Sequence, residues 1–271
     1  MGAGHLGRPL AEWLAGAGHD VLALARYSFF SHPQPAISPG PRLVSVPDFE
    51  DLERELQVFS PEAMVVCWAP GSRDPQDYRR VYVEGMERLM TRDFPDLRHA
   101  VYTSSTSVYE DLEGKVDESA RLAPRGEHAR LLLEAENIFK SGMERLGVAG
   151  CILRLAGLYS ADRPPARASL QKGVPLQGHP GDLVNLLHRE DAARALALAL
   201  EKRLCGVFNL ADGHPIRREE LYVAAAKAFG LPPPIWNSPV AENTREREIT
   251  PAKFAAATGW RPEHEAAQLG L

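Results

Sequence analysis

The stretch MGAGHLGRPLAEWLAGAGHDVLALAR (residues 1–26) decides the fold. Gly2, Gly4 and Gly7 form a G-x-G-x-x-G pattern, followed by apolar residues at helical spacing and by the strand-like run HDVLALAR (19–26). In such a loop the first glycine allows a tight turn, the second lets the backbone approach a pyrophosphate, and the third lets the helix pack on the sheet. The helix N-terminus adds unpaired N–H groups and a positive dipole. The stretch predicts a phosphate-binding turn, although the glycines alone would also fit an ordinary strand–helix turn.

Strand-like and helix-like segments alternate along the first 160 residues. Short apolar runs typical of buried strands occur at 42–46, 63–69, 99–105 and 149–157, and helical patterns occur at 49–59, 75–92 and 127–146. This alternation predicts an α/β fold with a doubly wound parallel sheet. The regular alternation of strand-like and helix-like segments ends near residue 160. We therefore expect a dinucleotide-binding domain at 1–160 and a smaller lobe at 161–271 that adds one strand (206–211) to the sheet.

The phosphate loop normally follows a buried strand, and here only Met1 precedes it. In the doubly wound order that strand is central, and its loss would leave neighbouring strands with unpaired backbone groups. We therefore expect the native protein to carry a strand of about 5 residues upstream of Met1.

Composition excludes several classes of protein. A formal net charge of −5 argues against a nucleic-acid or membrane-surface binder, because both usually carry a basic face. Apolar runs are too short for a membrane-spanning helix, and the N-terminus lacks a signal-peptide pattern. The three cysteines lie in apolar stretches, as reduced core residues of a cytoplasmic protein do. The nine histidines show no metal-ligand spacing, so we expect no metal.

The residue at the end of the second strand selects the cofactor in dinucleotide folds. A carboxylate there would bind the adenosine ribose hydroxyls, whereas this chain has Arg26 followed by Tyr27 and Ser28. A guanidinium suits a 2′-phosphate and stacks on adenine, which favours NADP(H) over NAD(H). The alternative is a solvent-exposed arginine at a strand end.

Further motifs point to a family. In chain order they are VYTSSTSVYEDLEG (101–114), GCILRLAGLYSADR (150–163), NLLHREDAARAL (185–196), FNLADGHPIRREEL (208–221) and GWRP (259–262). Together with the glycine loop, they resemble the extended short-chain dehydrogenase/reductases, also called NAD(P)-dependent epimerase/dehydratases. The resemblance implies a Rossmann fold. It also implies that the following residues bind the nicotinamide cofactor: Gly2, Gly4, His5, Leu6, Gly7, Arg26, Ala69, Pro70, Thr103, Ser104, Leu155 and Gly157.

The resemblance also implies catalytic roles. The family's serine, here Ser105, hydrogen-bonds the substrate oxygen, and a Y-x-x-x-K pair supplies a tyrosine whose pKa the lysine lowers from about 10. Counting back from Glu136 places His128 at the tyrosine position and Leu132 at the lysine position. The chain is thus similar to the atypical subgroup without this dyad. His128 is the candidate substitute proton donor, or else an exposed residue in the first helical turn.

Three residues outside the dyad also have expected roles. Arg154 could touch substrate or a cofactor phosphate, or form a structural ion pair. His188 and Asp191 are expected to fix a helix start and a loop.

Three hypotheses about function follow. The leading one is an NADP(H)-dependent oxidoreductase that acts on a small carbonyl or hydroxyl compound. The second is a non-catalytic NADP(H)-sensing regulator or scaffold, which the missing dyad motivates. The third is a sugar-nucleotide epimerase with a substitute base. The resemblance also suggests a homodimer formed through the helices at 75–92 and 127–146.

Overall fold

The computed structural model describes residues 1–26, 40–237 and 244–265, which form two units. The first unit comprises Met1–Glu110, Pro124–Arg154 and Ala193–Val207. The second comprises Asp111–Ala123, Leu155–Ala192 and the chain from Phe208 onward. The expected domain boundary at residue 160 stays a prediction.

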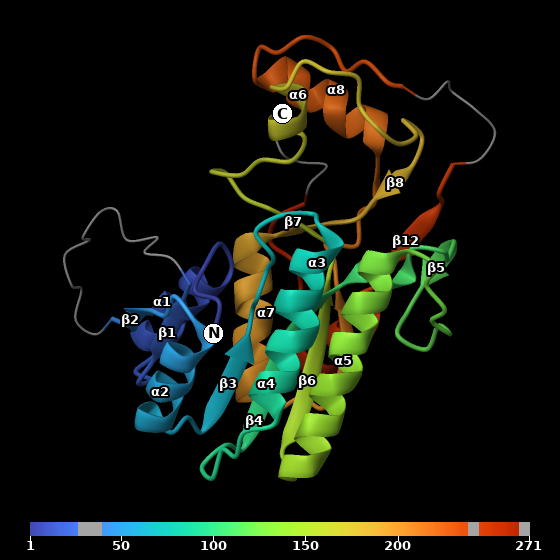
Figure 1. The fold of residues 1–271 in the computed structure, drawn as a ribbon. Coiled ribbons are helices and arrows are strands. Elements are labelled where there is room, and N and C mark those ends of the chain that lie inside the picture. The colour runs from blue at the N-terminus through green and yellow to red at the C-terminus, as the bar shows by residue number, and fades with distance from the viewer. Residues whose placement is uncertain (27–39, 238–243, 266–271) are drawn as a thin grey trace. The chain divides into compact units, whose positions relative to one another are not determined.

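Parallel strands form the centre of the first unit (Figure 1). Strands β3 (Ala63–Val66) and β4 (His99–Ser105) pair in parallel, with Val66 opposite Tyr102. They belong to a four-stranded sheet of order β10-β6-β4-β3, to which β6 (Ala149–Leu155) and β10 (Gly206–Leu210) contribute. A second parallel pair joins β1 (Leu22–Ala25) and β2 (Arg42–Ser45). The predicted α/β fold with a parallel sheet is confirmed.

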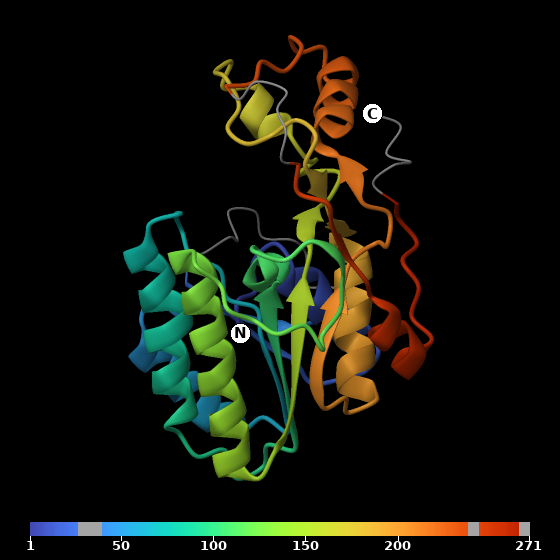
Figure 2. The ribbon, with the colours of Figure 1, turned by 90° about the vertical axis from the view of Figure 1, so that its right-hand side faces the viewer.

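Helices cover both faces of the four-stranded sheet. Figure 2 shows α4 (Gly85–Met90) and α5 (Glu127–Leu146) on one face and α7 (Arg189–Glu201, orange) on the other. The expected helix at 75–92 is divided into α3 (Pro75–Tyr78), a π-helical stretch (Arg79–Glu84) and α4.

Large side chains at most 1% exposed fill the space between the sheet and these helices: Met86, Leu89, Tyr102, Phe139 and Ile152. Burial of one such side chain stabilises the folded state by about 1.5–3 kcal/mol, so this layer holds α4 and α5 in place. Two more helices, α1 (Gly7–Gly16) and α2 (Phe49–Phe59), lie beside the strand pair β1 and β2 (Figure 1).

Residues 1–3 hydrogen-bond to both groups of strands. The N–H of Cys67 donates to the carbonyl of Met1 at 2.8 Å, and the N–H groups of Gly2 and Ala3 each donate to the carbonyl of Leu24 at 2.8 Å. The α-ammonium of Met1 donates to the carbonyl of Val65 at 2.6 Å. The glycine loop is therefore anchored to β1 and to the end of β3. The strand expected upstream of Met1 stays a prediction.

The second unit is built from short strands and helices. Strand β7 (Gly157–Tyr159) pairs in parallel with β9 (Leu186–His188), and β5 (Gly114–Val116) pairs in parallel with β12 (Arg247–Ile249). The remaining elements are β8 (Leu183–Val184), β11 (Ile216–Arg217), α6 (Arg167–Leu170), α8 (Arg218–Ala228) and α9 (Ala252–Thr258). Tyr159, Leu186 and Leu221 form a buried cluster within this unit.

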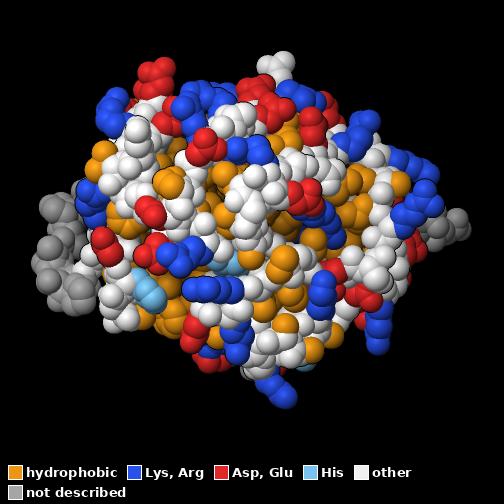
Figure 3. Space-filling model, turned by 90° about the horizontal axis from the view of Figure 1, so that it is seen from below, with side chains coloured by type: hydrophobic (Ala, Val, Ile, Leu, Met, Phe, Trp, Pro, Cys, Tyr) orange, Lys and Arg blue, Asp and Glu red, His pale blue; other side chains and the backbone are white. Residues whose placement is uncertain are grey.

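The charged side chains on the face drawn in Figure 3 are of mixed sign. Basic and acidic groups are interspersed there, with apolar atoms between them. This face does not present the field of one sign that nucleic-acid-binding surfaces carry. None of the helices in the described ranges combines the length and the apolar character needed to cross a membrane.

Candidate functional site

The glycines of the first loop differ in what surrounds them. Gly2 has φ +84°, and a Cβ atom added to it would lie 2.3 Å from the carbonyl oxygen of Cys67. A Cβ atom on Gly7 would lie 2.3 Å from the carbonyl oxygen of Gly2. A Cβ atom on Gly4 would meet no neighbouring atom of the described chain within 4 Å. Gly2 and Gly7 are therefore required by the turn and by close packing, whereas Gly4 faces open space in which an anion could approach the backbone.

Helix α1 begins at this loop without a side-chain cap. Leu6 occupies the N-cap position, and the first turn carries no acidic side chain. The first N–H groups of a helix have no partner within the helix, and the helix dipole is positive at this end. The loop geometry and the uncapped helix start thus fit a dinucleotide pyrophosphate. His5 is half-buried and Leu6 is buried within this turn.

Arg26 follows the last residue of β1, and its side chain is exposed. Its Nη2 donates to the carbonyl of Ala69, in the segment after β3, at 2.9 Å. Pro70 follows in the same segment and is half-buried. A guanidinium has five N–H donors, so this bond leaves others available to a second acceptor. Tyr27 and Ser28 lie outside the described residues.

Ser105 ends strand β4, and a short turn of 3₁₀-helix (Thr106–Tyr109) follows it. The hydroxyls of Ser105 and Ser107 are hydrogen-bonded at 2.5 Å, and the N–H of Ser107 donates to Oγ of Ser105 at 3.2 Å. The turn thus orients the half-buried Ser105 hydroxyl at the carboxyl end of the strand. Thr103 Oγ1 donates to the carbonyl of Val66 at 3.2 Å. Ser104 Oγ is buried, with no hydrogen-bond partner within the described ranges.

His128 lies in the first turn of α5. Its Nε2 is 2.9 Å from the carbonyl oxygen of Arg73, so Nε2 carries a proton and donates it to this bond. The ring makes an edge-to-face contact with Tyr78 at a centroid distance of 4.4 Å. Strands β4 and β6 are neighbours that point the same way (Figure 2), and α5 leads into β6, so the first turn of α5 lies at the sheet edge where β4 ends. Leu132, one turn later, is 3% exposed and belongs to the core.

Arg154 forms a buried ion pair. Its Nε and Nη2 donate to the two carboxylate oxygens of Glu136 at 2.9 and 2.6 Å, and its Nη1 donates to the hydroxyl of Tyr109 at 2.7 Å. All three side chains are at most 3% exposed. The sequence left two roles open for Arg154, and the structure shows the ion pair. The sequence did not identify Glu136 as the partner; an acidic residue on the apolar face of α5 is the signal that could have done so.

Leu155 and Gly157 lie in the second unit. Leu155 is buried at the end of β6, and the N–H of the exposed Gly157 donates to the carbonyl of Asn185 at 3.0 Å. The cofactor role expected for these two residues stays a prediction.

Comparisons with known proteins identify the family of the chain. The model of the NAD-dependent epimerase/dehydratase family matches residues 2–211. The curated protein YeeZ of Escherichia coli is 32% identical over 247 residues, which cover 86% of this chain and 84% of YeeZ.

Solved structures of similar fold include two bacterial epimerases in complex with NAD. UDP-glucose 4-epimerase of Thermus thermophilus is 24% identical with a TM-score of 0.80, over 99% of this chain and 94% of its own. UDP-glucuronic acid 4-epimerase of Bacillus cereus is 18% identical with a TM-score of 0.78, over 98% of this chain and 92% of its own. The chain belongs to the NAD-dependent epimerase/dehydratase family.

Proposed function

We propose that the protein is an NADP(H)-dependent oxidoreductase of the cytoplasm that acts on a small carbonyl or hydroxyl compound. The observation that supports this proposal most directly is the difference in packing among the glycines of the first loop. Gly2 and Gly7 are closely packed against carbonyl oxygens, whereas Gly4 borders open space at an uncapped helix start. A site of this form is suited to a pyrophosphate, which would accept hydrogen bonds from amides at the uncapped start of α1.

The preference for NADP(H) rests on Arg26. Both epimerases of similar fold were solved with NAD, so the proposed preference depends on the arginine at the end of β1 in this chain. Its guanidinium keeps donors beyond the bond to Ala69 and can pair with a 2′-phosphate in a bidentate manner. NADH offers no charge at this position, so we expect it to bind more weakly.

The protein's own residues would orient the substrate oxygen and exchange a proton with it. NADP(H), when bound, supplies or accepts a hydride at its nicotinamide ring. The hydroxyl of Ser105, oriented by Ser107, would donate a hydrogen bond to the substrate oxygen and polarise it. The bond from Nε2 of His128 to Arg73 leaves Nδ1 to exchange a proton with the substrate oxygen, directly or through a water molecule.

A non-catalytic NADP(H)-sensing regulator is the second candidate. It is favoured by the buried Leu132, since a leucine provides no ammonium to bind the ribose or to lower a neighbouring pKa. It is also favoured by the engagement of His128 with a backbone carbonyl, which suits a residue that fixes the segment around Arg73.

Titration of the purified protein with NADPH and NADH tests cofactor binding. We expect NADPH to bind at least about tenfold more tightly than NADH, which corresponds to about 1.4 kcal/mol. A protein that binds neither would contradict the proposal, and equal affinities would contradict the role of Arg26.

A panel of small carbonyl compounds with bound NADPH separates the two candidates. Turnover that Ser105→Ala lowers about 10²-fold in kcat/KM, with NADPH affinity unchanged, supports the oxidoreductase. NADPH binding without turnover, together with partner binding that changes with NADPH, supports the regulator. We also propose a homodimer formed through the helices at 75–92 and 127–146, and sedimentation velocity tests it.

A further inference from the structure

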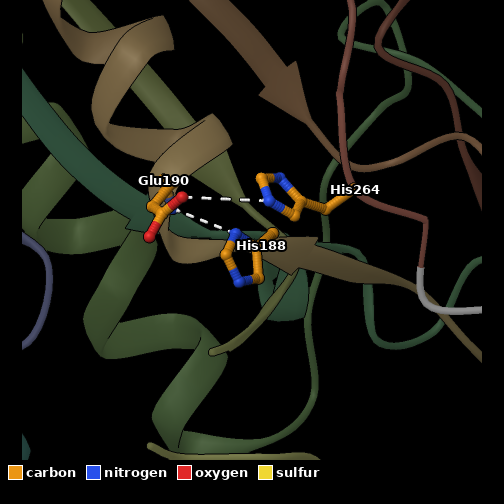
Figure 4. A group of neighbouring side chains, drawn as sticks. All are labelled: His188, Glu190 and His264. Carbon is orange, nitrogen blue, oxygen red and sulfur yellow. Dashed lines mark hydrogen bonds and ion pairs between the residues drawn. The ribbon is translucent and has the colours of Figure 1, made fainter. Parts of the chain in front are cut away.

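Three potential metal ligands meet in the second unit. His188 ends β9, Glu190 lies in the first turn of α7, and His264 lies in the segment that follows α9. One ligand atom from each lies within 4.8 Å of the other two (Figure 4). His188 is buried, His264 is half-buried and Glu190 is exposed, so the group is open to solvent on one side.

Asp191 fixes the orientation of His264. Its carboxylate oxygen Oδ2 accepts the N–H of His264 at 3.0 Å and lies 3.2 Å from Nδ1 of the same residue. Oδ1 accepts the N–H of Glu263 at 3.1 Å. A proton on Nδ1 leaves the lone pair of His264 on Nε2, which faces Glu190. This is the carboxylate–histidine arrangement that commonly supports metal-bound imidazoles.

The facing atoms make weak contacts with one another. His264 Nε2 and Glu190 Oε2 are 3.8 Å apart, which is too long for a hydrogen bond. His188 Nδ1 accepts the N–H of Glu190 at 3.4 Å, a long bond that gives Nδ1 little stabilisation. The two imidazole rings stack, with centroids 3.8 Å apart and planes 24° apart. Two imidazole nitrogens and a carboxylate oxygen are thus close together without strong bonds between them.

Several carboxylates lie near the three proposed ligands. The ring edge of Tyr159 packs against His188 at a centroid distance of 5.1 Å, and Asp191, Asp212 and Glu265 lie within electrostatic range of the same tyrosine. The nearby Arg189 is paired with Asp162 at 2.8 Å. A cation in this region would be attracted by several negative charges.

We propose that His188, Glu190 and His264 bind one divalent transition-metal ion of the Zn²⁺ class, with a further position open to water. Two imidazoles and one carboxylate form a ligand set that such ions accept. Tetrahedral bonds of about 2.0–2.2 Å would bring the ligand atoms to about 3.3–3.6 Å from one another, so the exposed Glu190 and the chain at His264 move inward by about 1 Å. The ion would fasten the segment around His264 to the start of α7.

The test uses tag-free, full-length protein stripped of metal with a chelator. Calorimetric titration with ZnCl₂ is expected to give one bound ion per chain, and Co²⁺ is expected to give d–d absorption bands. Glu190→Gln and His264→Gln are each expected to weaken Zn²⁺ binding by at least about tenfold. His19→Gln, at an exposed histidine outside the cluster, is the matched control and is expected to bind Zn²⁺ like the unmodified protein.

Stability measurements separate loss of the site from loss of the fold. Glu190 is exposed, so we expect Glu190→Gln without metal to keep the unfolding temperature of the unmodified protein. Zn²⁺ should raise that temperature in the unmodified protein and in His19→Gln, but not in Glu190→Gln or His264→Gln. No stoichiometric Zn²⁺ binding, or equal affinity in Glu190→Gln and the unmodified protein, would overturn the proposal.

Discussion

Replacing Gly4 by alanine separates cofactor binding from stability. The added methyl group meets no neighbouring atom of the described chain within 4 Å, and Gly4 does not have a positive φ. We therefore expect the free energy of unfolding to stay the same or to rise by up to about 1 kcal/mol, because alanine restricts the unfolded chain. The methyl group occupies space that a pyrophosphate needs, so NADPH affinity should fall at least about tenfold, or about 1.4 kcal/mol.

Gly7→Ala is the matched comparison in the same loop. Its Cβ atom would lie 2.3 Å from the carbonyl oxygen of Gly2, more than 1 Å inside the 3.4–4 Å of ordinary van der Waals contact. The obstacle is backbone that cannot rotate away, so we expect a loss of about 1–3 kcal/mol or more in the free energy of unfolding.

Urea denaturation followed by tryptophan fluorescence measures stability, and calorimetric titration measures NADPH affinity for both variants. If Gly4→Ala binds NADPH like the unmodified protein, the open space beside Gly4 is not the phosphate site. If Gly7→Ala is as stable as the unmodified protein, the packing argument for the loop is wrong.

Three further perturbations address the ion pair, the pH dependence and the cofactor preference. Glu136→Gln leaves the buried Arg154 without its carboxylate, so the free energy of unfolding should fall by about 3–5 kcal/mol in urea denaturation, and a loss below about 1 kcal/mol would refute the role of the pair. Burial lowers the pKa of His99 below its ordinary 6.5. Its unfolded form therefore binds the proton more tightly, and stability should be lost as the pH falls below about 6.5. Denaturation at pH 8 and pH 5 should show a smaller loss in His99→Gln, and an unchanged loss would contradict this cause. Arg26→Glu should weaken NADPH binding at least about tenfold while changing NADH binding much less, and equal losses for both nucleotides would count against the 2′-phosphate contact.

The sequence predicted the elements whose limits are set locally. The helix at 127–146 has the predicted bounds, because Gly147 ends it in the left-handed conformation that glycine adopts readily. The strand at 99–105 also has the predicted bounds, and its apolar residues Ala100, Val101 and Tyr102 are fully buried. The π-helical stretch inside 75–92 was missed, because the apolar period of a helix does not reveal one extra residue in a turn.

Contacts between residues that are far apart in the chain could not be predicted from the sequence. Glu136 and Arg154 lie on different elements, so the sequence left the role of the arginine open between two alternatives. The proposed metal ligands were not predicted for the same reason: His188 and Glu190 are two residues apart, but His264 comes from a segment beyond α9. The glycine loop could be predicted because its glycines and the helix that follows lie in one continuous stretch, whereas the Cys67 carbonyl that excludes a side chain at Gly2 comes from a distant segment.

A crystal structure of the protein soaked with NADPH tests the central claim most directly. We expect the pyrophosphate to lie against the loop amides beside Gly4, the 2′-phosphate to contact Arg26, and the nicotinamide ring to face Ser105. A crystal at saturating NADPH in which the nucleotide lies elsewhere, or does not bind, would contradict the account.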